Sequence, residues 1–157
     1  MASNLRAITD AITNLSVSYT NEAGATITPT AKDINQIPSG VIAAADIPLR
    51  LVGIITEGGN TDTMMYDAAG ASGEITHTVT ELALIENVGL SRTSDELPDQ
   101  QRYSDAIITT LVSNRSIYTN SDITGAVATR TVAEFPGGTE EFYYAVVTEI
   151  TIREFTS

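Results

Sequence analysis

The sequence predicts an α+β fold: a single two-layer domain, residues 1–157, in which two helices pack on one face of a mainly antiparallel sheet of about four strands. Three observations lead to this prediction. The chain has 157 residues, the length of one ordinary domain. Two stretches repeat apolar residues at helical spacing, and four others are rich in β-branched and aliphatic residues. We see no linker that would divide the chain, so helices on the apolar face of one sheet are the simplest packing.

The first expected element is an amphipathic helix near the N-terminus. Ser3 or Asn4 can cap it. Four aliphatic side chains follow at spacings of three and four residues: Leu5, Ile8, Ile12 and Leu15. Because this segment contains no long apolar run, we expect neither a signal peptide nor a membrane-spanning segment, and no membrane partner.

Residues 18–40 are rich in Thr, Asn, Gly and Pro, so we expect a loop in which only residues 25–28 could pair as a short strand. Residues 47–56 are dense in aliphatic residues and predict a mostly buried strand. A polar, glycine-rich loop is then expected over residues 57–73, with Met64, Met65 and Tyr66 at its centre. Long loops in compact domains are often functional, and these three side chains offer adaptable apolar area. We therefore predict an intersubunit contact here.

Residues 75–86 predict another strand, which contains the only histidine of the chain. By the two-residue period, His77 shares a face with Ile75 and Val79, whereas Leu82 and Leu84 fall on the other face. The change of phase near residue 81 predicts a bulge, or a strand that passes from one covering element to another. Because His77 lies between two threonines with no acidic neighbour in sequence, we expect a structural role for it and no catalysis.

The second helix is expected around residues 103–111, where Tyr103, Ile107 and Leu111 recur at helical spacing. Asp99 suits its N-terminal dipole and Arg115 the other end. Residues 120–125 are expected to form a turn. Strands at 126–135 and 141–155, separated by a Pro-Gly-Gly-Thr segment, then predict a closing hairpin. One face of the last strand is expected to carry its apolar residues: Phe142, Tyr144, Val146, Ile150 and Ile152.

The charge balance argues against direct binding to nucleic acid. Twenty acidic residues stand against eight basic ones, and the arginines are scattered singly, whereas duplex binders cluster their cations. The acidic surface suits solubility, or a wall past which DNA slides without sticking. The chain has no cysteine, which excludes disulfides, thiolate catalysis and cysteine-based metal sites.

The sequence offers little material for catalysis. We find no local motif for a nucleophile, a phosphate loop or a dinucleotide site. Residues 120–125 imitate the first half of a calcium loop, but Thr131 stands where an EF-hand has its bidentate glutamate. We therefore expect no catalytic, cofactor-binding or metal site, and no enzymatic activity.

Taken in order, these segments resemble the tail terminator proteins of long-tailed bacteriophages. The likeness rests on the N-terminal helix, the strand at residues 47–55, the run Ile75-Thr-His-Thr-Val-Thr-Glu-Leu-Ala-Leu-Ile-Glu86 with the following Asn-Val-Gly, the helix at 103–111 and the closing strand at 142–155. It spans nearly the whole chain. It is a likeness of architecture and pattern, without invariant residues.

The resemblance implies a virion protein, assembled in the host cytoplasm, that forms a homo-hexameric ring in the tail or neck. Such a ring caps the tail tube, and its partners are further copies of itself, the tail tube protein and the head-tail connector. DNA would pass through its channel without specific binding. Six acids in expected turns and loops are the candidates for the channel lining: Asp62, Asp67, Asp95, Glu96, Glu140 and Glu141.

Two alternatives stay open. The chain could be another structural protein of the neck or tail, either a head-closure protein or a tube subunit that stacks indefinitely. From a different class, it could be a small ligand-binding or enzymatic domain in which the loop with Met64, Met65 and Tyr66 acts as a lid. A ring in solution favours assembly, and a monomer with a concave apolar pocket favours the lid.

Overall fold

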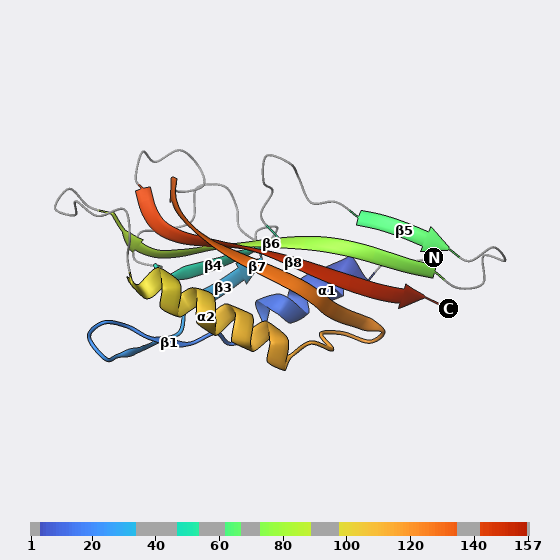
Figure 1. The fold of residues 1–157 in the computed structure, drawn as a ribbon, viewed down its shortest axis with the longest axis horizontal. Helices are drawn as coiled ribbons and strands as arrows, with labels where there is room; N and C mark the ends of the chain where they lie inside the picture. Colours follow the sequence, from blue (N-terminus) through green and yellow to red (C-terminus); the bar gives the residue numbers. More distant parts are fainter. Residues whose placement is uncertain are drawn as a thin grey trace.

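A computed structural model describes residues 4–33, 47–53, 62–66, 73–88, 98–134 and 142–156. These residues confirm the α+β class, with two helices and ten elements in all (Figure 1). The elements are α1 (Leu5–Thr13), β1 (Tyr19–Thr20), β2 (Thr26–Ile27), β3 (Thr30–Asp33), β4 (Leu49–Val52), β5 (Asp62–Tyr66), β6 (Gly73–Asn87), α2 (Pro98–Ser113), β7 (Ser121–Glu134) and β8 (Phe142–Thr156).

The main sheet has six strands where about four were expected. Its strand order is β3-β4-β6-β8-β7, and β5 pairs with β6 beside β4. All of its strand pairs are antiparallel except β3–β4, which is parallel. β1 and β2 form a separate two-stranded sheet. β2 lies within residues 25–28, where the sequence allowed a short strand. β1, β3 and β5 lie in segments expected to be loops. They were missed because runs of two to five residues show too little alternation to predict a strand.

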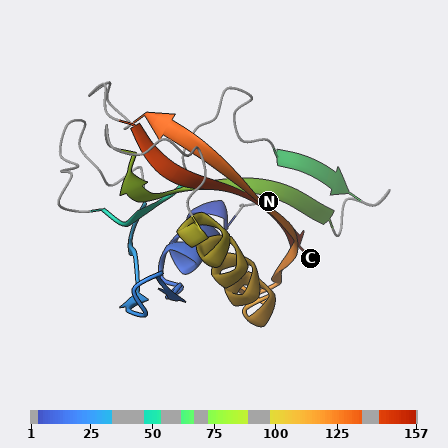
Figure 2. The same cartoon turned by 60° about the vertical axis from the view of Figure 1, so that its left-hand side comes forward.

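Both predicted helices are present, and they cover the same face of the sheet (Figures 1 and 2). Buried Ile8 and Ile12 come from α1, and Tyr103, Ile107 and Leu111 from α2. These side chains pack against aliphatic residues of the sheet in one core: Val52, Val79, Ala83, Ile85, Val146, Ile150 and Ile152. The predicted apolar stripes are therefore the faces that the helices bury.

The opposite face of the sheet is also buried over the middle of β6. Leu82 and Leu84 form a second apolar cluster there with Leu49 and Leu51 of β4 and Tyr143 of β8. From Val79 to Ile85, β6 is buried on both sides. The change of phase that we expected near residue 81 therefore arises because one continuous strand is buried on both faces there. The register shift with β8 lies later, between Leu84 and Glu86.

The predicted closing hairpin is confirmed in its two strands, since β7 and β8 pair along almost their whole length. The segment that joins them lies outside the described residues. The expected turn at residues 120–125 is shorter than predicted: Asn120 adopts a positive φ of 56°, and β7 begins at the next residue. A register shift between Ile123 and Gly125 then allows the strand to continue through the glycine.

Candidate functional site

His77 is fully buried and has an acidic partner, contrary to the expectation from its sequence neighbours. Its Nε2 lies 2.7 Å from Oε2 of Glu154, which comes from β8. The other carboxylate oxygen accepts a hydrogen bond of 2.9 Å from the backbone N–H of Asn4, at the start of α1. His77 stands opposite Ile152, so Glu154 is its diagonal neighbour on the same face. This contact ties the first turn of α1 to the end of the sheet.

The surroundings of Glu154 keep it ionised. Burial alone would raise its pKa, but the hydrogen bonds from His77 and Asn4 outweigh burial and lower the pKa below the usual value of 4.5. The sequence contained a signal for this residue. Glu154 lies two residues after Ile152 and therefore shares its face of the strand, which we expected to be apolar. An acidic residue at an apolar position of a strand is a signal for a buried ion pair or hydrogen bond.

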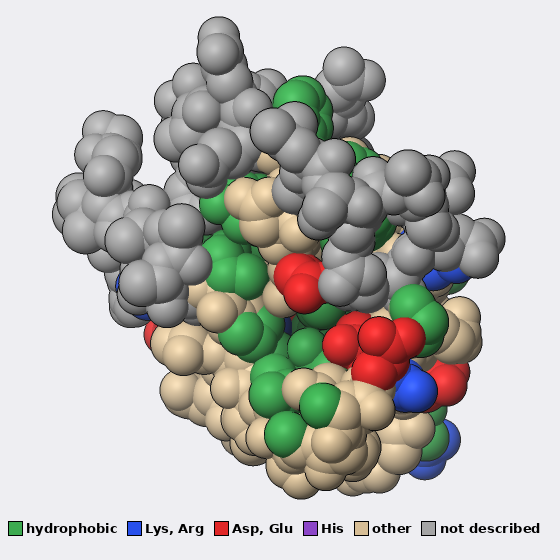
Figure 3. All heavy atoms as spheres, turned by 90° about the vertical axis from the view of Figure 1, so that its left-hand side faces the viewer, with side chains coloured by type: hydrophobic (Ala, Val, Ile, Leu, Met, Phe, Trp, Pro, Cys, Tyr) green, Lys and Arg blue, Asp and Glu red, His purple; other side chains and the backbone are tan. Residues whose placement is uncertain are grey.

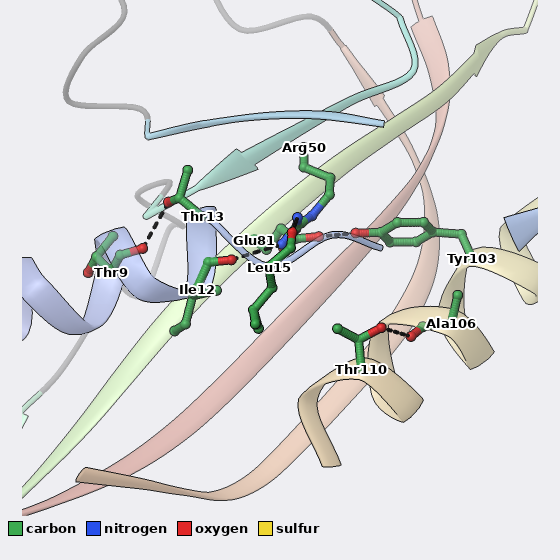
Figure 4. A network of polar contacts seen from close by, with 9 residues as sticks. All are labelled: Thr9, Ile12, Thr13, Leu15, Arg50, Glu81, Tyr103, Ala106 and Thr110. Carbon is green, nitrogen blue, oxygen red and sulfur yellow. Dashed lines mark hydrogen bonds and ion pairs between the residues drawn. The ribbon is translucent and has the colours of Figure 1, made fainter. Parts of the chain in front are cut away.

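A second buried polar cluster joins both helices to the sheet (Figure 4). Nε and Nη2 of Arg50 donate to Oε2 of Glu81 over 3.1 and 2.8 Å. The hydroxyl of Tyr103 in α2 donates to Oε1 of the same carboxylate. Arg50 also donates to the backbone carbonyls of Leu15 and Ile12, over 2.6 and 3.3 Å. The guanidinium thus bonds a carbonyl in the last turn of α1 and the carbonyl of Leu15 just beyond it, where α1 itself has no basic residue.

The charges of this cluster depend on one another. Burial would lower the pKa of Arg50, but the adjacent Glu81 carboxylate raises it above its usual value. Burial raises the pKa of the Tyr103 hydroxyl well above 10.0, and the charge of Glu81 raises it further. Arg50 therefore stays a cation and Tyr103 a neutral donor. The three side chains are 0 % exposed, so no substrate reaches them without a rearrangement of the core.

The two clusters were missed because each depends on strand register. Arg50 stands opposite Ala83 and Val52 opposite Glu81, which places Arg50 and Glu81 at diagonal positions on the helix-covered face. In the sequence, Arg50 is one of several scattered arginines, and Glu81 marked only the change of phase in its strand. Neither residue predicts the other until the pairing of β4 with β6 is known.

The three residues predicted to form an interface, Met64, Met65 and Tyr66, lie in strand β5 and not in a loop. Here the prediction of one continuous loop is wrong, because the backbone of residues 62–66 pairs with residues 73–77 of β6. Asp62, one of the six channel candidates, begins this strand. The other five, Asp67, Asp95, Glu96, Glu140 and Glu141, lie outside the described residues, and so do the flanks of the expected loop.

Acidic side chains do gather on a described surface that the sequence did not single out. At the end of the molecule where α2 begins, Asp99 and Glu86 lie near Tyr19, and with burial they raise the pKa of that tyrosine to about 12. Asp99 also accepts a hydrogen bond of 2.8 Å from Arg102. Figure 3 shows acidic and hydrophobic atoms side by side on this end.

One edge of the sheet is long and, within the described residues, open to a further strand. β7 has fourteen residues and pairs on one side with β8, and no other described strand pairs with it. Its residues Gly125 to Thr129 carry no charge, and Val127 is 63 % exposed. An open groove of about 830 Å³ runs between this stretch and α2. Ile108 of α2 and Ala128 of β7 are among its lining residues.

Natural sheets usually protect such an edge with lysines, prolines, inward charges or bulges. β7 has its one register shift before Gly125, and the stretch that follows has none of these devices until Arg130. We call residues Gly125 to Thr129 the β7 edge. Its backbone and its exposed valine can receive a further strand.

Comparisons with known proteins add no family to this description. No protein-family model matches the sequence, and a search of curated proteins gives no match either. Within the described ranges, no three His, Cys, Asp or Glu side chains lie together in a way that could hold a metal ion. Neither helix of the described part is long and apolar enough to cross a membrane.

Proposed function

We propose that the chain is a non-enzymatic structural protein of a virion and acts as the subunit of a ring, as the resemblance to phage tail terminators implies. The ring, hexameric by that resemblance, caps the tail tube on one side and meets the head-side connector on the other. Its partners are other copies of the same chain, the tube protein and the connector protein. DNA passes through the ring without specific binding.

The β7 edge is the observation that carries this proposal. An uncharged edge strand with an exposed valine is a template for pairing with another chain. In a protein that remains a monomer, such an edge leads to uncontrolled aggregation. In a closed ring, every copy of the edge has one defined partner, and no copy of the edge remains unpaired.

The buried polar clusters support a structural role over a catalytic one. The side chains of Arg50, Glu81 and Tyr103 bond to one another or to helix carbonyls, and His77 bonds to Glu154. All five are 0 % exposed. Groups with these contacts hold the helices on the sheet. Because their side chains are fully buried, a substrate cannot reach them from the surface.

The acidic composition supports a channel for DNA. A net charge of −12 per copy repels phosphate, and several copies around one axis add their fields. We propose that Asp62, Asp67, Asp95, Glu96, Glu140 and Glu141 supply acids to the wall. Because the Debye length is about 8 Å at physiological salt, their repulsion prevents adhesion and does not prevent passage. Retardation of DNA by the purified ring at that salt would contradict this part of the proposal.

The mass of the purified protein in solution tests the ring. Light scattering should give one multiple of the 16.6 kDa subunit mass that does not grow with concentration. Val127→Lys places a charge on the β7 edge and should yield folded monomers. The matched control Val112→Lys changes the same residue type at a site on α2 that is 70 % exposed, and it should leave the ring intact. A monomeric parent protein refutes the proposal.

A tube subunit is the second candidate, and the same edge favours it, because an unprotected edge can also build an open assembly. The two differ in closure: a terminator stops at one ring, whereas tube subunits stack into filaments whose mass rises with concentration. A ligand-binding or enzymatic domain, the alternative from another class, predicts a monomer of 16.6 kDa.

A further inference from the structure

We propose that the β7 edge of one copy pairs with strand β5 of the next copy, so that the sheet continues from subunit to subunit. This inference rests on the proposed ring and names the joint that builds it. The partner is a second copy of the chain because, among the described strands, the same sheet has two edges without a further paired strand, on opposite sides. Figures 1 and 2 show β5 beyond β6 on one side and β7 on the other.

Each of the two strands has a strand partner on one side only within the described sheet. β7 pairs with β8, and β5 pairs with β6. A contact between two different edges of identical subunits is heterologous, and heterologous contacts generate rings when their rotation closes. One chain therefore supplies both halves of the joint.

The opposite side of the sheet has a second edge strand, β3, and its sequence makes it the poorer partner. β3 ends with Lys32 and Asp33, and charges on an edge oppose pairing. β5 has five residues, of which the last four, Thr63 to Tyr66, are uncharged. The β7 edge is an uncharged stretch of five residues.

The strand directions also fit. β5 and β8 both run antiparallel to β6, and β7 runs antiparallel to β8. β5 and β7 of one copy therefore point in opposite directions. When the sheet continues from copy to copy in the same orientation, the strands that meet at the joint are antiparallel, which is the slightly more stable pairing.

Charge favours one register of this antiparallel joint. By register, Met65 and Val127 belong to one face of the sheet, and Asp62 and Arg130 to the other. When Met65 stands opposite Val127, Asp62 stands directly opposite Arg130, the first charged residue after the β7 edge. Opposite charges directly across a pair of strands stabilise it.

The joint requires a stagger between neighbouring copies. Within one sheet, Met65 is level with Glu74 of β6, whereas Val127 is level with Thr80 of β6 through Glu149 of β8. Pairing Met65 with Val127 shifts the next copy along the strand direction. Sheets that close into a barrel need such a shift, because their strands tilt relative to the barrel axis.

Cysteine cross-linking tests the joint directly, because the chain contains no cysteine of its own. Two double variants combine Val127→Cys with either Met64→Cys or Met65→Cys. Neighbouring residues of a strand point to opposite faces, so one of the two variants should form an intersubunit disulfide and the other should not. Under mild oxidation, that variant should give a ladder of covalent oligomers that ends at the ring. Val112→Cys replaces the edge cysteine in the control, which should give no ladder.

A charge exchange gives an independent measurement that does not depend on oxidation. Asp62→Arg and Arg130→Asp should each shift the ring toward monomers, and the double variant should restore it. Rings without a ladder in either cysteine pair, and without restoration by the double exchange, overturn the joint but leave the proposed ring intact. If the parent protein forms no ring at all, the proposed function fails together with the joint.

Discussion

Removing the charge of Arg50 should destabilise the fold more than any other single arginine substitution on a described strand. Arg50→Met keeps a long unbranched side chain of similar reach but deletes the guanidinium. The change leaves the Glu81 carboxylate buried at 0 % exposure without its cation, and it takes the donors away from the carbonyls of Ile12 and Leu15. Of the contacts to the Glu81 carboxylate described above, the hydrogen bond from the Tyr103 hydroxyl remains in this variant.

The expected loss follows from what remains buried. Breaking a buried ion pair by removing one partner costs about 3–5 kcal/mol, because the other charge loses its compensation. Domains of this size have a free energy of unfolding of about 5–15 kcal/mol, so the variant should be close to unfolding. Tyr103→Phe removes one hydrogen bond to the same charged group and should cost about 1.5–3 kcal/mol. It serves as the milder variant if Arg50→Met does not fold.

Urea denaturation followed by circular dichroism measures these losses. Arg153→Met is the matched control, since Arg153 pairs with Glu74 over 2.8 Å but its side chain is 48 % exposed. Exposed pairs contribute at most about 1 kcal/mol. The double variant Arg50→Met, Glu81→Met removes both charges and should recover part of the loss. If Arg50→Met costs no more than Arg153→Met, the buried pair does not hold the helices as we infer.

Four further substitutions test other parts of the fold by the same denaturation assay. Ile107→Ala should cost about 2–5 kcal/mol by leaving a cavity under α2, whereas Val112→Ala on its exposed side should change stability by less than about 0.5 kcal/mol; equal effects would contradict the assigned buried face. Thr148 Oγ1 is buried without a hydrogen-bond partner among the described residues, so Thr148→Val should stabilise the protein by about 1 kcal/mol, and a loss would show that the hydroxyl is satisfied. The lowered pKa of Glu154 means that the unfolded chain binds more protons in acid, so this residue contributes stability above pH 4.5 that is lost as pH falls through its folded pKa; Glu154→Gln should flatten that fall, and an unchanged pH profile would exclude the role. His77→Gln can keep a hydrogen bond to Glu154 and should leave ring assembly intact, whereas loss of assembly in a stably folded variant would point to a functional histidine.

The helices and the long strands could be predicted from the sequence because their signals are local. The apolar residues of α2 recur at helical spacing from residue 103 to residue 111, and Tyr103, Ile107 and Leu111 are all buried as expected. The last strand alternates over most of its length. Of the side chains expected on its apolar face, Tyr144, Val146, Ile150 and Ile152 are in the core, whereas Phe142 is 51 % exposed. Periodicity of this length indicates both the element and its buried face.

The short strands and the polar clusters could not be predicted, because they depend on pairings between distant segments. β5 has no local pattern that separates it from a loop, and it exists because residues 73–77 extend beyond the end of β4 and offer an edge. Arg50 and Glu81 meet only after β4 has paired with β6. The β7 edge followed from the sheet order, since the hairpin alone does not show which of its strands lies outermost.

The central claim is that this chain closes into a ring through one defined edge. Electron microscopy of the purified protein tests it most directly. We predict closed rings of a single tier with an open centre, at every concentration at which the protein is stable. Monomers at all concentrations, or filaments that lengthen as the concentration rises, would contradict the account.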